Sequence, residues 1–517
     1  MSNLRERNLI MIKLESYYIK NFKGFEDSGI VASDRINVFT GVNSGGKTTL
    51  IQGLLFIKQM LEGKDSDINF NGSYIKLGEF NDIVFKHSLE KEITIGLLIN
   101  YSKDRQRNEK EKKKDIIFSA IVDEISKTKD KGHHYDAINI KVEFGMRKKL
   151  EEVIISSYRI EVFDPTGEYK SVFELKYDLK KDNYKITEDP LSSAFNWKEI
   201  KNVLDDLDLP DDVIKSIIKN NFDKMQNELN IRFDGPLIPK ECYKEDIDDS
   251  YTFNKVFTEY IKHILKEITS KIYYIGPIRM QPQRLYRYDK DYDNVKMNYQ
   301  GENATYIYNK ISERNYDFIL PPDNDGEKYD TIVDENRSFK EWITIWTKYI
   351  MGIKNDFLTN KKGISSYELK VNDHLITNVG FGASQIFPIL VEGMREKDGI
   401  IIFEQPEIHL HPNAQARLVD FFIAIARYNN LKVIVETHSI HFIERLVRRM
   451  VEDYQLHEQV SILFVDTEKY LKSKITHLKY NELGGVEEWP DDFLNQTGLR
   501  ETERLYRAQR NKLTEKE

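Results

Sequence analysis

The sequence predicts an α/β fold in which two α/β halves are separated by a long insertion of a different character. Near the N-terminus, a strand-like run at residues 35–40 enters a Gly-rich turn, and apolar residues then recur at helical spacing. Buried-type strands alternating with amphipathic helices return at 272–275 and dominate from about residue 375. The segment between the halves lacks this alternation. We therefore expect one split domain rather than three domains in a row.

Composition and charge narrow the class of protein. The chain has 517 residues, and its 77 Lys and Arg against 85 Asp and Glu give a net charge of −8, which argues against coating nucleic acid through bulk charge. The single cysteine, Cys242, excludes an internal disulfide framework and suits a reducing compartment. No apolar stretch approaches the ~18–20 residues of a membrane helix, so a cytoplasmic protein without a membrane partner is expected.

The first predicted domain, residues 1–100, is the N-terminal α/β half. A strand-like run covers 12–22, and the second strand, 35–40, precedes helical apolar spacing over 50–61. Residues 75–84 are predicted to be a turn with short strands.

The second predicted domain, residues 101–270, is an α+β insertion. It opens with the segment 103–114, whose seven basic and three acidic residues predict a solvated loop. The acidic stretch 197–270 is predicted to be helical, for example over 251–268. Heptads are not sustained over several turns, so no long coiled coil is expected. The strand-like runs are 115–122, 137–144, 152–163 and 171–179.

The third predicted domain, residues 271–497, is the C-terminal α/β half, followed by a charged tail at 498–517. Short apolar runs predict strands, and apolar residues at helical spacing predict helices between and after them. The expected strands are 272–275, 399–403 and 431–435, and the expected helices are 414–427 and 440–451.

The strongest motif is the run Gly-Val-Asn-Ser-Gly-Gly-Lys-Thr at 41–48, which fits the phosphate-loop pattern G-x-x-x-x-G-K-[ST]. A strand precedes it and a helix begins within it, so backbone N–H groups and the helix dipole favour nucleotide phosphates. Lys47 is expected to reach the β- and γ-phosphates of ATP, and the Thr48 hydroxyl to ligate Mg²⁺. The residues predicted to bind the cofactor here are Asn43, Ser44, Gly45, Gly46, Lys47, Thr48 and Thr49.

Two later strands end in polar residues. The run Gly-Ile-Ile-Ile-Phe-Glu-Gln-Pro-Glu at 399–407 places Glu404 where a carboxylate can meet Mg²⁺. The strand at 431–435 leads to Glu-Thr-His-Ser, and ligands of α/β sheets bind outside the carboxyl ends of the strands. A neutral His438 there can hydrogen-bond a γ-phosphate or the attacking water.

A second glycine-rich helix start lies at 378–385, with the sequence Asn-Val-Gly-Phe-Gly-Ala-Ser-Gln. Ser384 is predicted to be the N-cap, and the glycines free backbone amides at this helix end. One ATP site seldom needs two anion-binding helix ends. The second end is therefore expected to serve a partner's nucleotide in a two-fold dimer, through Gly382, Ser384 and Gln385.

These motifs together resemble the ABC-type ATPase head shared by SMC proteins, RecF and the OLD nucleases, and most closely its bacterial AAA-fifteen branch with a C-terminal domain of unknown function. The likeness covers about 1–100 and 270–497. The residues that carry it besides the four motifs are Ile-Lys-Asn-Phe-Lys at 19–23, Ile-Gly-Pro-Ile-Arg at 275–279, Gly-Glu-Asn at 301–303, Glu-Gln-Pro-Glu-Ile-His-Leu-His-Pro at 404–412 and Glu-Glu-Trp-Pro-Asp-Asp-Phe at 487–493.

The resemblance implies a role for each motif. It makes 41–49 the Walker A loop, Glu404 the Walker B metal residue, 380–385 the signature segment, 409–412 the D-loop and His438 the switch histidine. Gln405 then stands where many ABC ATPases keep the catalytic Glu. Because an amide cannot accept a proton as a carboxylate does, and general-base catalysis contributes ~10²–10⁴-fold, we expect tight ATP binding and slow or conditional hydrolysis unless Glu407 or His438 substitutes.

The resemblance also bears on partners. OLD nucleases carry a Toprim domain after the ATPase, whereas only 517 − 439 = 78 residues follow Ser439, and they hold no Asp-x-Asp pair. The chain is therefore expected to be a sensor or regulator whose nuclease is supplied in trans. Its branch includes ATPases of bacterial anti-phage defence, and the chain is similar to the Septu-type ATPases, which pair with an HNH nuclease.

Other functions stay open. One alternative is a DNA-repair or chromosome-maintenance ATPase of the RecF/SMC kind, with the insertion as a DNA-binding lobe. Another is a nuclease with an unrecognised site inside 115–270, and a local DNA contact is compatible with either. Arg279 is open between a phosphate or interface contact and an internal salt bridge.

Overall fold

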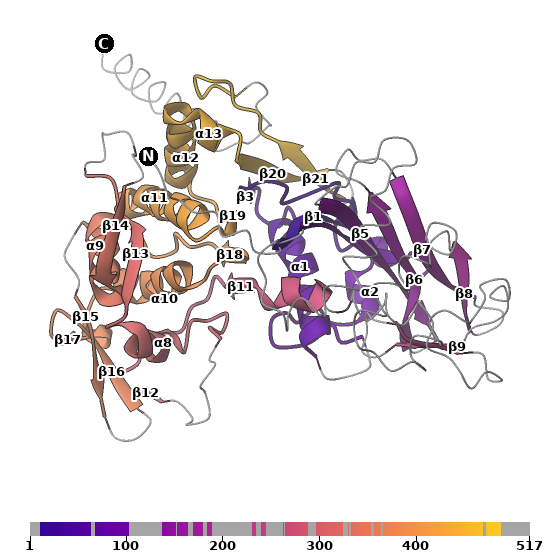
Figure 1. The fold of residues 1–517 in the computed structure, drawn as a ribbon, viewed down its shortest axis with the longest axis horizontal. Helices are drawn as coiled ribbons and strands as arrows, with labels where there is room; N and C mark the ends of the chain where they lie inside the picture. The colour runs from indigo at the N-terminus through magenta and orange to yellow at the C-terminus, as the bar shows by residue number, and fades with distance from the viewer. Residues whose placement is uncertain are drawn as a thin grey trace, which may run out of the picture. The chain divides into compact units, whose positions relative to one another are not determined.

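The computed structural model divides into two compact units (Figure 1). Unit 1 is formed by residues 1–31 and 49–271, and unit 2 by residues 32–48 and 272–517. The structure describes residues 11–63, 68–102, 137–150, 152–163, 169–178, 183–188, 230–233, 239–243, 262, 264–287, 296–323, 329, 332–352, 356–362, 366–468 and 472–486.

Unit 1 is built on a seven-stranded antiparallel sheet, drawn in indigo to magenta in Figure 1. In sheet order, its strands are β2 (Phe25–Asp27), β1 (Met11–Phe22), β4 (Ile93–Ser102), β5 (Ala137–Lys149), β6 (Glu152–Phe163), β7 (Tyr169–Asp178) and β8 (Asn183–Glu188). Burial alternates at the start of β1, where Ile12 and Leu14 are buried while Lys13 and Glu15 are exposed. The strand predictions for 12–22, 137–144, 152–163 and 171–179 agree with β1, β5, β6 and β7 to within a few residues.

The domain boundary predicted at residue 100 is not where the units separate. Strand β4 pairs along its whole length with β5, so the predicted first domain and the predicted insertion share one sheet. Residues 32–48 instead belong with the C-terminal half. The cause is non-local pairing, since β4 finds its second partner, β5, in the insertion, and a sequence pattern carries no label for the partner strand.

The predicted helical stretch 197–270 is only partly helical in the described residues. It contains the antiparallel pair β9 (Asn230–Phe233) and β10 (Pro239–Tyr243), which corrects the prediction there. Helical residues run over 264–270, with Ile264, Leu265 and Ile268 buried. The basic segment 103–114, the strand predicted at 115–122 and the tail 498–517 lie outside the described residues.

Helix α1 (Lys47–Glu62) begins in unit 2 and continues in unit 1. It contains the amphipathic helix predicted over 50–61. Helix α1 is buried on nearly every side. Gly53 lets Ile19 pack closely against it, since a Cβ on residue 53 would lie 2.7 Å from Ile19 Cγ2. Even Lys58 is buried, and its ammonium donates to Glu62 and to the Thr269 carbonyl at 2.9 and 2.8 Å. Shortly after α1, the segment predicted as a turn contains the one-turn helix α2 (Phe80–Ile83).

Unit 2 is built on a six-stranded sheet whose members come from both ends of the chain. In sheet order, the strands are β11 (Ile272–Ile275), β18 (Ile400–Glu404), β19 (Lys432–Glu436), β3 (Ile36–Gly41), β20 (Val460–Glu468) and β21 (Lys472–His477). All neighbours are parallel except the edge strand β21. Strand β3 lies between two strands from the C-terminal half, so the predicted α/β fold split by an insertion is confirmed.

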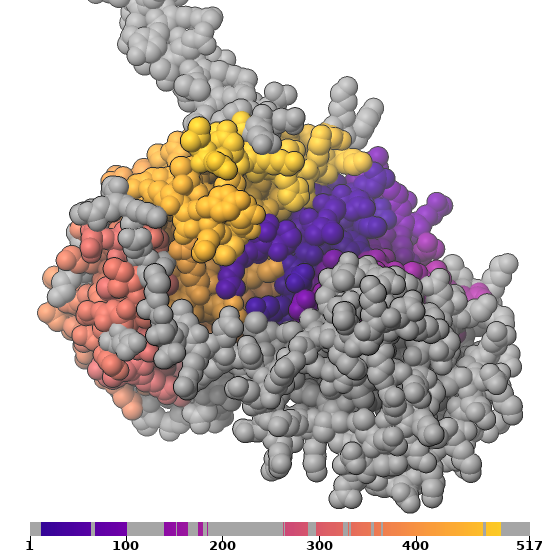
Figure 2. All heavy atoms as spheres, turned by 45° about the horizontal axis from the view of Figure 1, so that its top comes forward, coloured from indigo at the N-terminus to yellow at the C-terminus, as the bar shows by residue number. Residues whose placement is uncertain are grey.

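Helices surround this sheet and share its core. They are α8 (Ala304–Ile311), α9 (Phe339–Met351), α10 (Phe381–Arg395), α11 (Pro412–Tyr428), α12 (Ile440–Glu452) and the short α13 (Tyr454–His457). Trp346 of α9 packs edge-on against Phe421 of α11 at 5.3 Å, and Phe422 stacks on Phe403 of β18 at 4.7 Å. On the face in Figure 2, the yellow C-terminal elements lie against the orange elements of the same unit.

Unit 2 also contains two smaller sheets among its described residues. The first has the order β12 (Tyr286–Arg287), β16 (Ser366–Val371) and β15 (Phe357–Lys361), and β17 (His374–Leu375) pairs with β16. The second is the pair β13 (Asn315–Ile319) and β14 (Val333–Ser338). No helix in the described part of the chain is long and apolar enough to cross a membrane, and none there extends into a long coiled coil.

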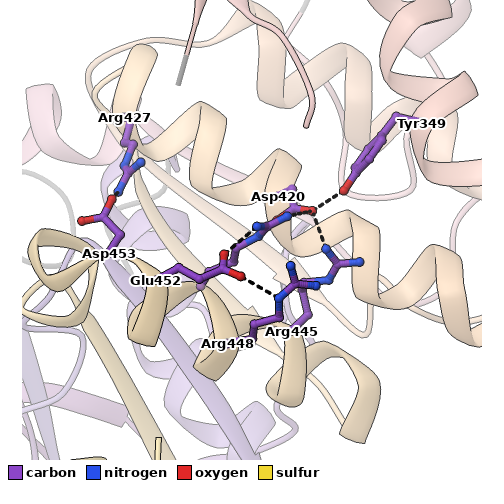
Figure 3. A network of polar contacts seen from close by, with 8 residues as sticks. Tyr349, Asp420, Arg427, Arg445, Arg448, Glu452 and Asp453 are labelled. Atoms are coloured by element: carbon purple, nitrogen blue, oxygen red, sulfur yellow. Dashed lines mark hydrogen bonds and ion pairs between the residues drawn. The ribbon is translucent and has the colours of Figure 1, made fainter. Parts of the chain in front are cut away.

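A buried polar network joins three helices of unit 2 (Figure 3). Asp420 of α11 is fully buried and accepts hydrogen bonds from Arg449 and Arg445 of α12 and from Tyr349 of α9. Its carboxylate is thereby satisfied on both oxygens, as a buried charge requires. Arg448, on the same helix, instead pairs with Glu452 at a more exposed position.

Candidate nucleotide-binding site

Three neighbouring parallel strands of unit 2 end at one edge of the sheet and carry the predicted motifs there. Strand β3 ends at Gly41 and enters the loop 42–46, β18 ends at Glu404 and β19 ends at Glu436. Glu404 and Glu436 are register partners in adjacent strands. The carboxyl edge of such a sheet is where ligands of α/β folds bind.

The conformation of the loop explains its glycines. Gly41 has a φ of +136°, and a Cβ there would lie 2.0 Å from the Val465 carbonyl oxygen. Gly46 also has a positive φ of +113°, and a Cβ on Gly45 would lie 2.7 Å from the same oxygen. Only glycine fits this close approach to β20. The loop thus keeps its backbone amides free of side chains at the start of α1.

Lys47 and the start of α1 make this edge suited to anions. The Lys47 ammonium folds back over the loop and donates to the carbonyls of Val42 and Gly41 at 2.6 and 3.3 Å. Burial lowers the pKa of Lys47, and the nearby Glu436 opposes that shift. The first turn of α1 has no acidic residue of its own, and the helix dipole there favours an anion. Asn43 and Ser44 are exposed on the loop.

A set of hard oxygen atoms lies beside the loop. Thr48 donates its hydroxyl to the Glu436 carboxylate, with oxygen–oxygen distances of 2.9 and 3.1 Å. Burial raises the pKa of Glu404 to about 8, with a further contribution from the charge of Glu436, and burial likewise raises the pKa of Glu436. Two buried carboxylates that disfavour each other's charge, next to a hydroxyl, match the oxygen ligands that Mg²⁺ prefers. Thr48, Glu404 and Glu436 could therefore hold the ion.

Glu436 was not among the residues predicted for the site. Its signal was nevertheless visible in the sequence, because it ends a buried apolar strand just as Glu404 does. Two adjacent strands that both end in Glu place two carboxylates at one sheet edge. The sequence prediction included only the first of them, Glu404.

The residues predicted to be catalytic lie on the two turns that leave β18 and β19. Gln405, with a φ of +44°, donates its backbone N–H to the Glu436 carbonyl at 2.8 Å, and its side chain hydrogen-bonds the Glu436 carboxylate. The His438 N–H donates to Glu407 Oε1 at 2.8 Å. His438 is exposed, and desolvation followed by the charge of Lys47 lowers its pKa, which favours the neutral imidazole.

Glu407 differs from Gln405 in its surroundings. Its side chain is buried, and burial raises its pKa despite hydrogen bonds from the His438 backbone and the Thr437 side chain. Its second oxygen, Oε2, has no hydrogen-bond partner among the described residues. A buried carboxylate with a raised pKa and one free oxygen has the properties of a general base.

The predicted signature segment begins α10, but its cap differs from the prediction. The N-cap is Gly380, not Ser384, because the Ser384 hydroxyl donates to the Phe381 carbonyl at 2.7 Å within the first turn. Gln385 is buried at 2 % exposure, and its Oε1 accepts from Arg279 Nε at 3.2 Å. Gly382 lies against the predicted D-loop, where a Cβ would be 3.1 Å from the His409 carbonyl oxygen.

The predicted D-loop shares a surface with the signature segment. The rings of Phe381 and His409 meet edge-on with centroids 4.7 Å apart, and both residues are exposed. His411 caps α11, since its Nδ1 accepts from the Asn413 N–H at 3.4 Å. The described residues contain no group of three or more His, Cys, Asp or Glu side chains placed to hold a metal.

A P-loop at the head of a parallel sheet, with a carboxylate at the end of the neighbouring strands, defines the class of P-loop ATPases. Comparison with protein families then places the chain within that class: residues 12–443 match the family described as AAA ATPase domain, and the chain belongs to it. No curated protein matches the chain.

Solved structures give weak likenesses. The SMC head domain from Thermotoga maritima is 10% identical with a TM-score of 0.32, and the match covers 90% of this chain and 99% of that one. A Smc head domain with an extended coiled coil, bound to the C-terminal domain of ScpA derived from Pyrococcus furiosus, is 11% identical with a TM-score of 0.35 and covers 91% of this chain and 97% of that one. At these scores neither likeness carries a conclusion about function.

Proposed function

We propose that this ATPase binds ATP with Mg²⁺ tightly and hydrolyses it slowly or conditionally, as the regulatory subunit of a larger system. The observation that carries the proposal is the contrast between Gln405 and Glu407. The position that follows the metal residue has an amide, whereas the only carboxylate of that turn is buried and has one oxygen without a partner among the described residues.

Binding follows from the loop and the oxygen set. The loop amides and Lys47 would hold the phosphates, while Thr48, Glu404 and Glu436 would hold Mg²⁺. When bound, the ion supplies neutralisation of phosphate charge. To reach a phosphate, Lys47 has to leave the carbonyls of Gly41 and Val42. The exchange is favourable because a hydrogen bond from the ammonium to a charged phosphate is stronger than one to a neutral carbonyl.

Glu407 is the proposed general base. Its Oε1 is fixed by the His438 N–H, so Oε2 is the oxygen that would take a proton from the attacking water. The neutral His438 imidazole would hydrogen-bond the water or the γ-phosphate. Because Glu407 lies two residues beyond Gln405, the reaction would need a particular placement of the turn, which makes turnover slow or conditional.

Self-association is the second part of the proposal. The start of α10 and the segment 409–411 share one exposed surface through Phe381 and His409. A second copy could present its nucleotide to the Gly382 and Ser384 end of α10, completing a two-fold ATP sandwich. ATP-dependent dimerisation, measured by light scattering with wild-type protein and Lys47→Ala, tests this part.

The biological role we propose is bacterial anti-phage defence with a nuclease supplied in trans, the HNH type being favoured by the resemblance to Septu-type ATPases. The test is co-purification of the chain with the product of its native neighbouring gene, with and without ATP. A neighbour without nuclease activity would overturn it. A RecF- or SMC-like repair role stays compatible with the AAA ATPase family and predicts ATP-dependent DNA binding with a steep salt dependence.

The ATPase proposal has its own experiment. Wild type is expected to bind ATP with Mg²⁺, and Lys47→Ala to lose roughly 10–100-fold in affinity, the size of a charged hydrogen-bond set. Glu407→Gln is expected to lower the residual turnover by about 10²–10⁴-fold and to keep ATP binding. Rapid turnover that survives Glu407→Ala would overturn the assignment of the base.

A further inference from the structure

Three buried side chains around the Gln405 turn each keep one polar atom without a hydrogen-bond partner among the described residues. The atoms are Arg279 Nη1, Gln385 Nε2 and Glu407 Oε2. The residues are 3, 2 and 7 % exposed, so solvent does not satisfy these atoms. Unsatisfied buried polar atoms are costly, and two donors with one acceptor in a single neighbourhood indicate a function rather than chance.

Arg279 is the residue that connects this neighbourhood. It lies just after β11, and its Nε donates to Gln385 Oε1 of α10 at 3.2 Å, while its Nη2 donates to the Gln405 carbonyl at 3.0 Å. One planar guanidinium thereby spans the signature helix and the turn beyond the metal residue. The planar fork of arginine can serve both acceptors at once, which a lysine ammonium cannot do in the same geometry.

The charge of Arg279 is also tied to Glu407. Burial lowers the pKa of Arg279 to about 10, and the charge of Glu407 is the opposing influence. The remaining donor, Nη1, and the Glu407 oxygen Oε2 both lack a hydrogen-bond partner among the described residues. Gln385 and Gln405 hold the guanidinium by its other two nitrogens and so set where Nη1 can reach.

We propose that Arg279 is a positioning residue that couples the signature helix α10 to the carboxylate of Glu407. The inference rests on the proposed role of Glu407 as the base. A shift of α10 moves Gln385, and Gln385 moves the guanidinium to which the Gln405 carbonyl is bound. The orientation of the Glu407 turn then depends on α10, the element that a second copy would contact. Hydrolysis then depends on the position of α10, a helix that carries no reacting group.

The test compares Arg279→Gln and Arg279→Lys with Arg284→Gln. Arg284 lies on the same loop but is exposed, which makes it the matched control. Turnover is measured with enzyme in excess over radiolabelled ATP, and ATP affinity by titration. Both Arg279 variants are expected to lose at least about 10-fold in turnover, within the range of general-base catalysis, with ATP affinity within about twofold of wild type. Arg284→Gln is expected to match wild type in both.

The double variant Arg279→Gln/Glu407→Gln decides between coupling and independent effects. It is expected to turn over no more slowly than Glu407→Gln alone, since both changes disable one arrangement. Turnover of Arg279→Gln within twofold of wild type would overturn the inference. So would a parallel loss of ATP affinity and thermal stability in the Arg279 variants, which marks a merely structural role.

These experiments distinguish a wrong assignment of Glu407 as the base from a wrong coupling through Arg279. If Glu407→Gln keeps full turnover, the proposed function is wrong, whatever Arg279 does. If Glu407→Gln is inactive and Arg279→Gln is active, only the coupling is wrong. Where wild-type turnover is below detection, thermal unfolding of wild type, Arg279→Gln, Glu407→Gln and the double variant decides. Strictly additive shifts in Tm refute the coupling. A double variant that is no less stable than the worse single variant supports it.

Discussion

Thr48 and Glu436 are joined by a hydrogen bond of 2.9 Å at the point where the phosphate loop meets the end of β19. Two residues of the proposed metal site are thus already in contact, and Glu404 is the register partner of Glu436. The carboxylates are held in place by the sheet, whereas the hydroxyl is held by the helix. Placement on rigid elements favours a preorganised site.

Glu436→Gln tests the second carboxylate. Removing one charge from the oxygen set is expected to weaken ATP binding about 10-fold in the presence of Mg²⁺, or ~1.4 kcal/mol, and to leave binding in EDTA nearly unchanged. Calorimetric titration with and without Mg²⁺ measures the difference. Glu444→Gln, an exposed change on α12, is the control. Equal weakening with and without the ion would assign Glu436 to the fold rather than to the metal.

Gly41→Ala tests the close approach of the loop to β20. An alanine Cβ would meet the Val465 carbonyl oxygen at 2.0 Å in a backbone region that L-residues rarely adopt. The loop has to shift, so we expect ATP binding to be lost and stability to fall by roughly 1–3 kcal/mol. Gly380→Ala, which meets nothing within 4 Å, should change stability by no more than about 0.5 kcal/mol in urea unfolding. Intact ATP binding by Gly41→Ala would contradict this account of the loop.

Asp420→Asn tests the buried network of Figure 3. The change removes the buried counter-charge of Arg449, which is 1 % exposed, and leaves it only the partly exposed Glu452. Breaking a buried pair on one side costs about 3–5 kcal/mol, so urea unfolding should show a loss of that size. The control is Arg448→Met, which removes a partly exposed pair with Glu452 and should cost at most about 1 kcal/mol. Similar losses for the two variants would mean that burial does not set the cost.

Glu392 predicts a pH dependence of stability. Burial raises the pKa of this α10 residue to about 8, and Arg395, which also pairs with Glu396, offsets only part of the shift. The folded protein then holds a proton that the unfolded chain releases near its ordinary pKa of about 4.5. Stability is therefore expected to fall as pH rises from about 4.5 to 8, by on the order of 4 kcal/mol.

The matching measurement is Tm between pH 5 and 9 for wild type and Glu392→Gln. The variant should lose less stability across that window, because its amide does not ionise. Glu313→Gln, an exposed change, should follow wild type. Parallel curves for Glu392→Gln and wild type would remove Glu392 as the cause.

The sequence predicted the local parts of the site better than the long-range ones. The strand, loop and helix around Lys47 follow one another in the chain, so spacing alone located them. Ser384 was misplaced as an N-cap because its hydroxyl bonds back to the Phe381 carbonyl, a choice between two local acceptors that spacing does not decide. Gly380 takes the cap position instead.

Long-range relationships needed the structure. The boundary expected at residue 100 failed because β4 pairs with β5, and pairing partners in a sheet are not encoded in either strand alone. The contact between Arg279 and Gln385 joins residues 106 positions apart. A contact at that separation leaves no periodicity in the sequence, so Arg279 stayed open between several roles until the two side chains were seen together.

The place of β3 has a consequence for synthesis of the chain. A ribosome makes Ile36–Gly41 long before its sheet neighbours β19 and β20, which begin at Lys432 and Val460. This apolar central strand therefore lacks both sheet neighbours until residues 432–468 have been made, and an unpaired strand exposes a nascent chain to misassembly. The same delay acts as quality control, because a polypeptide released early lacks the neighbours that shape its phosphate loop.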